Sequence, residues 1–158
     1  MKRLALLWLA CAACGGSDAD VAGNFSVSVT NRDNGCNFQN WTVGDQATGI
    51  QVTITQDGSN VTATVGGVTG ALLDIALGGH AYTGVVDGDD LALDLVGTRA
   101  MQMGNCTFTY NSAIDASIDG DVLTGEVHYR GAGNGNSDCA SITGCDTFQD
   151  FNGTRPPE

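Results

Sequence analysis

Hydrophobic and polar residues alternate along most of the chain after its first twenty residues. In residues 24–30, Phe and Val occupy every second position between Asn, Ser and Thr, and residues 50–55 and 61–65 repeat this pattern on either side of the segment 56–60. Apolar side chains at every second position predict β-strands with one buried face and one solvent-facing face. The Asp-Gly pair in the segment 56–60 is typical of a β-hairpin turn.

The same alternation predicts six further strands, which makes nine candidates, of which about eight are expected to form. They cover residues 72–77, 80–86, 91–96, 107–119, 123–129 and 147–155. The clearest hairpin joins 107–119 to 123–129 through an Asp-Gly-Asp turn. Because the connections are short, the predicted fold is an all-β, antiparallel up-and-down meander of about eight strands closed into a barrel. A β-sandwich is the alternative.

The first twenty residues differ from the rest of the chain. Lys2 and Arg3 precede an uncharged apolar run at 4–10, and small residues then lead to Cys14. A positive start, a short apolar core and small residues after it predict a secretory signal peptide, and the run is shorter than the roughly 20 residues that span a bilayer. Small residues before Cys14 and Gly-Gly-Ser-Asp after it resemble the lipobox of bacterial lipoproteins. That resemblance implies cleavage before Cys14 and lipidation of this cysteine; an ordinary cleaved signal peptide is the alternative.

The predicted organisation has four parts. A lipoprotein signal peptide covers residues 1–13, lipidated Cys14 and a flexible tether cover 14–22, one disulfide-bonded β domain covers 23–155, and a tail covers 156–158. A chain of this length forms one domain with one core. The expected location is the bacterial cell envelope, with a lipid anchor in the membrane. The glycine after Cys14 favours the outer membrane, because Asp in that position retains lipoproteins at the inner membrane of enteric bacteria.

The charge of the chain restricts its partners. Once Lys2 and Arg3 leave with the signal peptide, four arginines face 18 acidic residues, a net charge of −14. Such a surface repels phosphate backbones and anionic head groups, which argues against nucleic-acid binding and leaves membrane attachment to the lipid. The many acidic residues are interpreted as keeping the protein soluble, and binding of cations or basic partners is the alternative. The protein is expected to be a monomer. The acidic turns at 87–90 and 119–121 fit neither an EF-hand nor a calcium-binding repeat and are interpreted as β-turns.

Four cysteines remain in the predicted domain: Cys36, Cys106, Cys139 and Cys145. An even number of cysteines in an exported chain predicts two disulfides, with three ways to pair them. The short spacing of the last two favours Cys139–Cys145 as a local bridge, which leaves Cys36–Cys106, while the other two pairings stay open. A zinc site is disfavoured, because zinc-binding cysteines come in tighter pairs with histidine nearby. No metal and no cofactor are therefore predicted.

Several segments resemble proteins of known families. Those at 36–41, 50–65, 105–108 and 151–156, with the pair Cys139/Cys145, are similar to uncharacterised lipoproteins of myxobacteria and their relatives. This resemblance implies an envelope location and carries no established activity. More loosely, Gly23-Asn24-Phe25 at the first strand and Arg155 at the end of the last resemble lipocalin-like barrels, which carry Trp at the position of Phe25. This second resemblance concerns the fold alone.

The sequence contains no recognisable catalytic constellation. A Gly-x-Ser-x-Gly nucleophile turn does not occur, and no free thiol is expected. Glu126, His128 and Arg130 share one face of a predicted strand, whereas the alternate positions Val127 and Tyr129 share the other. The apolar face should contact the core, so the charged trio is expected to face solvent. The chain is therefore predicted not to be an enzyme.

A barrel of about eight strands is just wide enough to hold one small ligand. The candidate ligand-binding residues are aromatic: Trp41, Tyr82, Phe108, Tyr110 and Tyr129. Aliphatic inward positions complete the expected lining, at Val52, Ile54, Leu93 and Val127. Trp41 and Phe38 are expected either to line the barrel mouth or stack on a sugar, or to form a loop that covers the core.

Two functional hypotheses follow from these patterns. The first is a cell-envelope lipoprotein that binds a small apolar ligand or lipid inside its barrel. The second is a structural or protein-interaction module of the envelope with a filled core and no ligand. They differ in whether the interior contains a cavity of a few hundred Å³.

Overall fold

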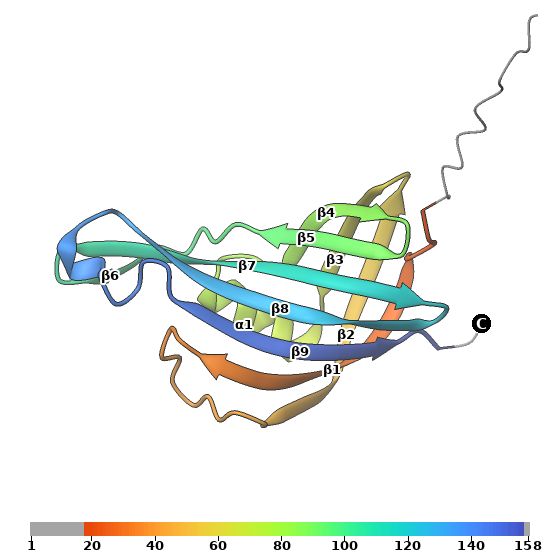
Figure 1. The fold of residues 1–158 in the computed structure, drawn as a ribbon, viewed down its shortest axis with the longest axis horizontal. Coiled ribbons are helices and arrows are strands. Elements are labelled where there is room, and N and C mark those ends of the chain that lie inside the picture. The colour runs from red at the N-terminus through yellow and green to blue at the C-terminus, as the bar shows by residue number, and fades with distance from the viewer. Residues whose placement is uncertain (1–17, 157–158) are drawn as a thin grey trace, which may run out of the picture.

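The computed structural model describes residues 18–156, and the predictions for the signal peptide and for lipidation at Cys14 lie outside that part, as does most of the tail (Figure 1). Within it the chain forms nine β-strands, one α-helix and one short 3-10 helix. In chain order these elements are β1 (Gly23–Asn34), β2 (Gln46–Asp57), β3 (Asn60–Val65), α1 (Gly67–Ala76), β4 (Ala81–Asp87), β5 (Asp90–Leu95), β6 (Met101–Met103), β7 (Cys106–Asp119), β8 (Val122–Gly133), η1 (Ser137–Cys139) and β9 (Asp146–Thr154).

The strands form one antiparallel sheet that closes on itself. Each strand from β1 to β5 pairs with the next, β7 pairs with β8 and β8 with β9, and the pairs β1–β9 and β5–β7 complete the ring. Eight strands make up this barrel, since β6 pairs only with β7, outside the ring. The prediction of an antiparallel meander barrel of about eight strands is confirmed, and the sandwich alternative is excluded.

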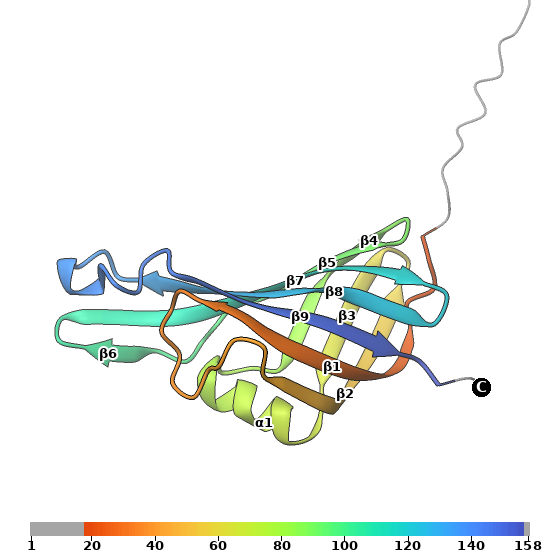
Figure 2. The same ribbon diagram turned by 60° about the horizontal axis from the view of Figure 1, so that its bottom comes forward.

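Residues 72–77, predicted as a strand, belong instead to α1 and the residue that ends it. The Ala-Leu-Leu stretch in this helix consists of good helix formers, and a short apolar run is by itself ambiguous between strand and helix. Gly70, Leu73 and Leu77 fall on the side of the helix that packs against the barrel. A side chain at Gly70 would collide with the carbonyl oxygen of Val65, so the close approach of α1 requires glycine there. Figure 2 shows α1 lying beneath the barrel, and it contacts β2 and β3.

The end of the barrel away from α1 is closed by the segment that precedes β1. Val21 and Phe25 are fully buried there. The backbone N–H of Val21 donates to Gln56 Oε1 (2.8 Å), and Gln56 Nε2 donates to the carbonyl oxygen of Ala19 (3.1 Å). The prediction of a flexible tether over residues 14–22 is therefore wrong for residues 19–22, because the burial of Val21 fixes this part of the chain to the barrel.

Tight turns join the strands at this closed end. Gly58, Gly88 and Gly120 have φ of +60°, +62° and +59°, a conformation that glycine adopts without the steric cost that other residues meet. The acidic segments 87–90 and 119–121 are thus turns, as predicted. No helix among the described residues is long and apolar enough to cross a membrane.

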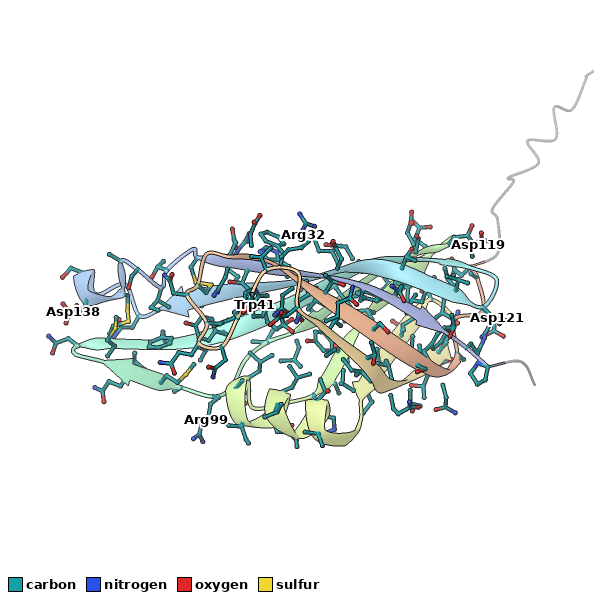
Figure 3. The ribbon with its side chains drawn as sticks, turned by 90° about the horizontal axis from the view of Figure 1, so that it is seen from below. Arg32, Trp41, Arg99, Asp119, Asp121 and Asp138 are labelled. Atoms are coloured by element: carbon teal, nitrogen blue, oxygen red, sulfur yellow. A yellow bond between two sulfur atoms is a disulfide. The ribbon has the colours of Figure 1, made fainter. Side chains whose placement is uncertain are left out.

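The hairpin of β7 and β8 extends well beyond the barrel at the other end (Figure 1). Pairing of β5 with β7 stops at Ser112, and residues 106–110 continue into a projection that also contains β6, the end of β8 and η1. We call this projection the arm. Asp138 lies at its tip, whereas Asp119 and Asp121 lie at the closed end of the barrel (Figure 3).

Two disulfides form, as predicted, but their pairing differs from the expected one. The bonds are Cys36–Cys145 and Cys106–Cys139, with Cα–Cα distances of 4.9 and 5.0 Å. Strand β1 lies beside β9 and pairs Asn34 with Thr147, which brings the first pair of cysteines together. The chain leaving β8 returns past the start of β7, which brings the second pair together. The prediction of Cys139–Cys145 and Cys36–Cys106 is wrong because contacts between strands that are distant in sequence outweighed short spacing.

Candidate ligand-binding site

The interior of the barrel contains a cavity of about 270 Å³. All eight barrel strands and α1 contribute to its wall, which is mostly aliphatic. The alternating pattern places small side chains at several inward positions, among them Ala63 and Ala116, and these leave space that larger residues would fill. Since an apolar cavity of about 150 Å³ accepts benzene, this volume suits a molecule of roughly ten non-hydrogen atoms.

The structure places the predicted lining residues in two groups. Tyr82 and Tyr129 line the cavity, together with all four of the expected aliphatic residues. Trp41, Phe108 and Tyr110 do not line it. Phe108 and Tyr110 are on the same face of β7 as the cavity-lining Ile114, but they lie on the part of β7 that belongs to the arm, beyond the last pairing with β5.

The polar side chains of the wall are those of Thr69, Tyr82, Tyr129 and Gln149. Tyr82 Oη donates to Ser112 Oγ (3.0 Å), and both residues are buried. Tyr129 Oη donates to Gln149 Oε1 (3.0 Å), and Gln149 Nε2 donates to Asn31 Oδ1 (2.7 Å). Burial raises the pKa of both phenols above the ordinary value for tyrosine, so both are neutral at physiological pH.

The cavity has its mouth at the end covered by α1. Ala47, near the start of β2, and Leu72, on α1, line the cavity and are also exposed to solvent, Leu72 by 59%. The cavity therefore opens between α1 and the start of β2. Helix α1 is weakly secured: its N-cap, Gly66, makes no side-chain hydrogen bond, and its first turn holds no acidic residue to complement the helix dipole. Such an element is expected to open at a lower free energy than the strands.

Sequence reasoning missed Ala47, Thr69, Leu72, Leu73 and Gln149, which also line the cavity. Three of them belong to α1, which was predicted as a strand or a connection. Gln149 is two positions before Phe151 on β9, so the two side chains share the inward face of the strand. Periodicity could therefore have placed Gln149 inward, but a polar residue in a weakly predicted strand gave no reason to assign it to a ligand site.

The loop between β1 and β2 forms an aromatic cover over Tyr129. Phe38 contacts Tyr110 edge-on with ring centroids 4.8 Å apart, and it also contacts Trp41 and Tyr129 at 5.8 and 5.9 Å. Trp41 Nε1 donates to the carbonyl oxygen of Arg32 (2.8 Å). Of the two expectations for this loop, the structure matches the one in which it covers the core next to a disulfide, since Trp41 contacts Phe38 and Tyr129 and does not line the cavity.

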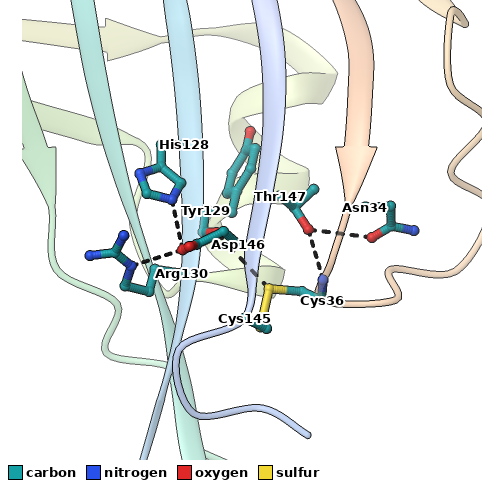
Figure 4. A network of polar contacts seen from close by, with 8 residues as sticks. All are labelled: Asn34, Cys36, His128, Tyr129, Arg130, Cys145, Asp146 and Thr147. Carbon is teal, nitrogen blue, oxygen red and sulfur yellow. Dashed lines mark hydrogen bonds and ion pairs between the residues drawn. A yellow bond between two sulfur atoms is a disulfide. The ribbon is translucent and has the colours of Figure 1, made fainter.

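Glu126, His128 and Arg130 lie on the outer face of β8, away from the cavity, as predicted. His128 Nε2 is 2.8 Å from Asp146 Oδ1, and Arg130 Nε donates to the same oxygen (2.8 Å; Figure 4). The hydrogen bonds from Arg130 and then His128 lower the pKa of the Asp146 carboxyl below its ordinary value. His128 also stacks on Phe148 with ring centroids 4.5 Å apart. These contacts join the outer faces of β8 and β9.

At the closed end, Arg155 and Phe25 contact each other. The guanidinium carbon of Arg155 lies 5.6 Å from the centre of the Phe25 ring, and its Nη1 donates to the carbonyl oxygen of Ala22 (2.6 Å). Phe25 and Arg155, two of the residues on which the resemblance to lipocalin-like barrels was based, thus form one interaction, which joins β1 to the end of β9.

The fold and cavity define the class of this protein: a closed, eight-stranded antiparallel β-barrel with an apolar interior site. No protein-family model matches the chain, and no curated protein matches it. A solved structure described as EF1p2_mFAP2b bound to DFHBI is similar over 85% of this chain and 93% of that chain, with 14% sequence identity and a TM-score of 0.47.

Proposed function

We propose that this chain is a lipid-anchored protein of the bacterial cell envelope whose barrel binds one small, mostly apolar ligand. The cavity of about 270 Å³ carries this proposal, because its wall is apolar and it has a mouth at α1. A cavity with a mostly apolar wall accepts apolar molecules.

The proposed anchoring rests on the sequence before the described residues. A signal peptide at 1–13 and Cys14 at its end resemble a lipoprotein signal. Cys14 is four residues before Asp18, so a lipid on it would lie within about 14 Å of the closed end of the barrel. The mouth at α1 would then face away from the membrane that holds the lipid, where it is accessible to ligands. The outer membrane is the proposed location.

Native mass spectrometry of the oxidised protein, produced with its own signal peptide and purified from the envelope in mild detergent, tests both parts. The spectrum reports the acyl mass on Cys14 and any retained small molecule. We expect Ala116→Leu, which fills the cavity, to lose the retained molecule. Ala92→Leu is the matched control, because Ala92 lies on the outer face of β5. An adduct that persists in Ala116→Leu, or a wild type that stays empty when small apolar probes are added, would reject ligand binding in the barrel.

The alternative is an interaction module of the envelope, and the outer side of α1 favours it. Val68, Leu72 and Ile75 are exposed by 79%, 59% and 68% and share one side of the helix. If the chain is an interaction module, the double variant Val68→Ser/Ile75→Ser should no longer form a chemical cross-link to an envelope partner, while its retention of the small ligand should be unchanged. Loss of the retained ligand without loss of a cross-link would instead assign these residues to the mouth.

A further inference from the structure

We infer that the cavity selects an uncharged molecule with a hydroxyl group, such as a small aliphatic alcohol, and rejects carboxylates such as fatty acids. This inference rests on the proposed function and defines its ligand more narrowly. The charge of the wall, the direction of its hydrogen bonds and the net charge of the chain each contribute to it.

Of the residues that the structure describes, none that lines the cavity carries a charged side chain. Among residues 18–156 the cations are four arginines, and three of them are used elsewhere: Arg32 and Arg130 pair with carboxylates on the outer face of the barrel, and Arg155 pairs with Asp121 at the closed end. Arg99 lies beside α1 and points away from the barrel (Figure 3). A carboxylate inside the barrel would therefore be buried without a counter-ion, which is strongly unfavourable.

The hydrogen bonds of the wall also disfavour an acceptor-only ligand. Tyr82 and Tyr129, which both line the cavity, have already donated their hydroxyl hydrogens to Ser112 and Gln149, so each phenol can only accept a further hydrogen bond. The amide nitrogen of Gln149 has donated one of its two hydrogens to Asn31. A hydroxyl group can donate to a phenol oxygen and accept from the amide, whereas a carboxylate can only accept.

The residues next to the mouth along the chain are acidic. Asp45 precedes Ala47 by two positions, and Asp74 follows Leu72 by two positions; both aspartates are exposed. The whole chain has a formal net charge of −12. Asp74 is paired with His80 Nδ1 (2.7 Å), so the net charge of the whole chain is what disfavours the approach of an anion, while a neutral molecule is unaffected.

The test compares three probes of equal length: 1-octanol, octanoate and octylammonium. Isothermal titration calorimetry uses residues 14–158, the chain left after the proposed cleavage, with Cys14→Ser, so that neither an acyl chain nor the apolar signal segment is present and no detergent is needed. At pH 7 we expect 1-octanol to bind at least tenfold more tightly than octanoate. At pH 4 octanoate should gain affinity, because its protonated form is neutral, whereas 1-octanol should not. Octylammonium should bind more weakly than 1-octanol, since the wall offers it no carboxylate.

A charge introduced at the mouth provides the second measurement. Thr69 on α1 lines the cavity, so Thr69→Lys places a cation there, and Thr69→Gln is the neutral control. We expect Thr69→Lys to bring octanoate to at least the affinity of 1-octanol, while Thr69→Gln keeps the wild-type order.

The outcomes separate the two proposals. If wild type binds octanoate as tightly as 1-octanol at pH 7, the inference is overturned and the proposed function stands. An unchanged order of affinities in folded Thr69→Lys also overturns it, because the selection would then not arise at the wall. If none of the three probes binds wild type, the proposed function itself fails. The pH dependence in wild type decides the question even if Thr69→Lys does not fold.

Discussion

Removing each disulfide in turn tests how the barrel and the arm are held together. Cys36–Cys145 closes a loop of 109 residues that contains most of the barrel, whereas Cys106–Cys139 closes 33 residues formed by the β7–β8 hairpin. Both cysteines of a pair are replaced by alanine, because Cys36, Cys106 and Cys139 are buried and serine would bury an extra hydroxyl.

The size of each effect follows from loop length. A cross-link lowers the entropy of the unfolded chain, and this loss of entropy increases with the logarithm of the number of residues that the cross-link encloses. The 109-residue and 33-residue separations correspond to about 4.8 and about 3.7 kcal/mol at 25 °C. Compared with a total stability of about 5–15 kcal/mol, either loss is large. We therefore expect loss of Cys36–Cys145 to destabilise the protein by about 1 kcal/mol more than loss of Cys106–Cys139.

Urea unfolding followed by circular dichroism measures this difference. With a slope of about 2 kcal/mol per M, the two midpoints should fall by about 2.4 and about 1.9 M. Hydrogen exchange adds a regional readout: loss of Cys106–Cys139 should remove protection from β6 and η1 and leave β1–β3 protected. Before these variants are made, peptide mapping after pepsin digestion, with the disulfides left unreduced, checks which cysteines are paired. A Cys139–Cys145 peptide, or a larger loss for the shorter loop, would refute the reasoning.

Three further predictions concern side-chain interactions. Tyr82→Phe and Ser112→Ala should each destabilise by about 1–2 kcal/mol, and the double variant by clearly less than their sum, which a thermal double-mutant cycle would show. Asp146→Asn should be less stable than wild type at pH 7. Because the hydrogen bond from Arg130 lowers the folded-state pKa of Asp146, the difference should shrink as the pH falls below the unfolded value of about 3.9; urea titrations at pH 7 and pH 3 check this. Arg155→Gln should cost about 1–3 kcal/mol, and an unchanged melting temperature would contradict the role of its contacts at the closed end.

The strands could be predicted from the sequence because side-chain alternation is a local property. Residues 107–119 show it over six repeats, and the structure forms β7 at almost the same positions. Short connections between such strands leave few topologies other than a meander. The helix could not be predicted in the same way, since residues 72–77 form a short apolar run that suits either element.

The composition of the candidate site was only partly predictable. Alternation identified Tyr82 and Tyr129 as inward-facing, and both line the cavity. It also identified Phe108 and Tyr110, but it could not show where along β7 the barrel ends and the arm begins. That boundary depends on the length of β5, which pairs with β7 only as far as Ser112.

By itself, then, the sequence determined the strands, their inward and outward faces and the tight turns at the closed end, all of which depend on neighbours within a few residues. Only the tertiary structure decided the pairing of the four cysteines, the position of α1 and the volume of the cavity. Each of these depends on contacts between segments far apart in the chain: Cys36 meets Cys145 because β1 lies beside β9, and the cavity exists because eight strands close into a ring. The physical reason is that local pattern sets the direction of each side chain, whereas the space between side chains is set by the whole barrel.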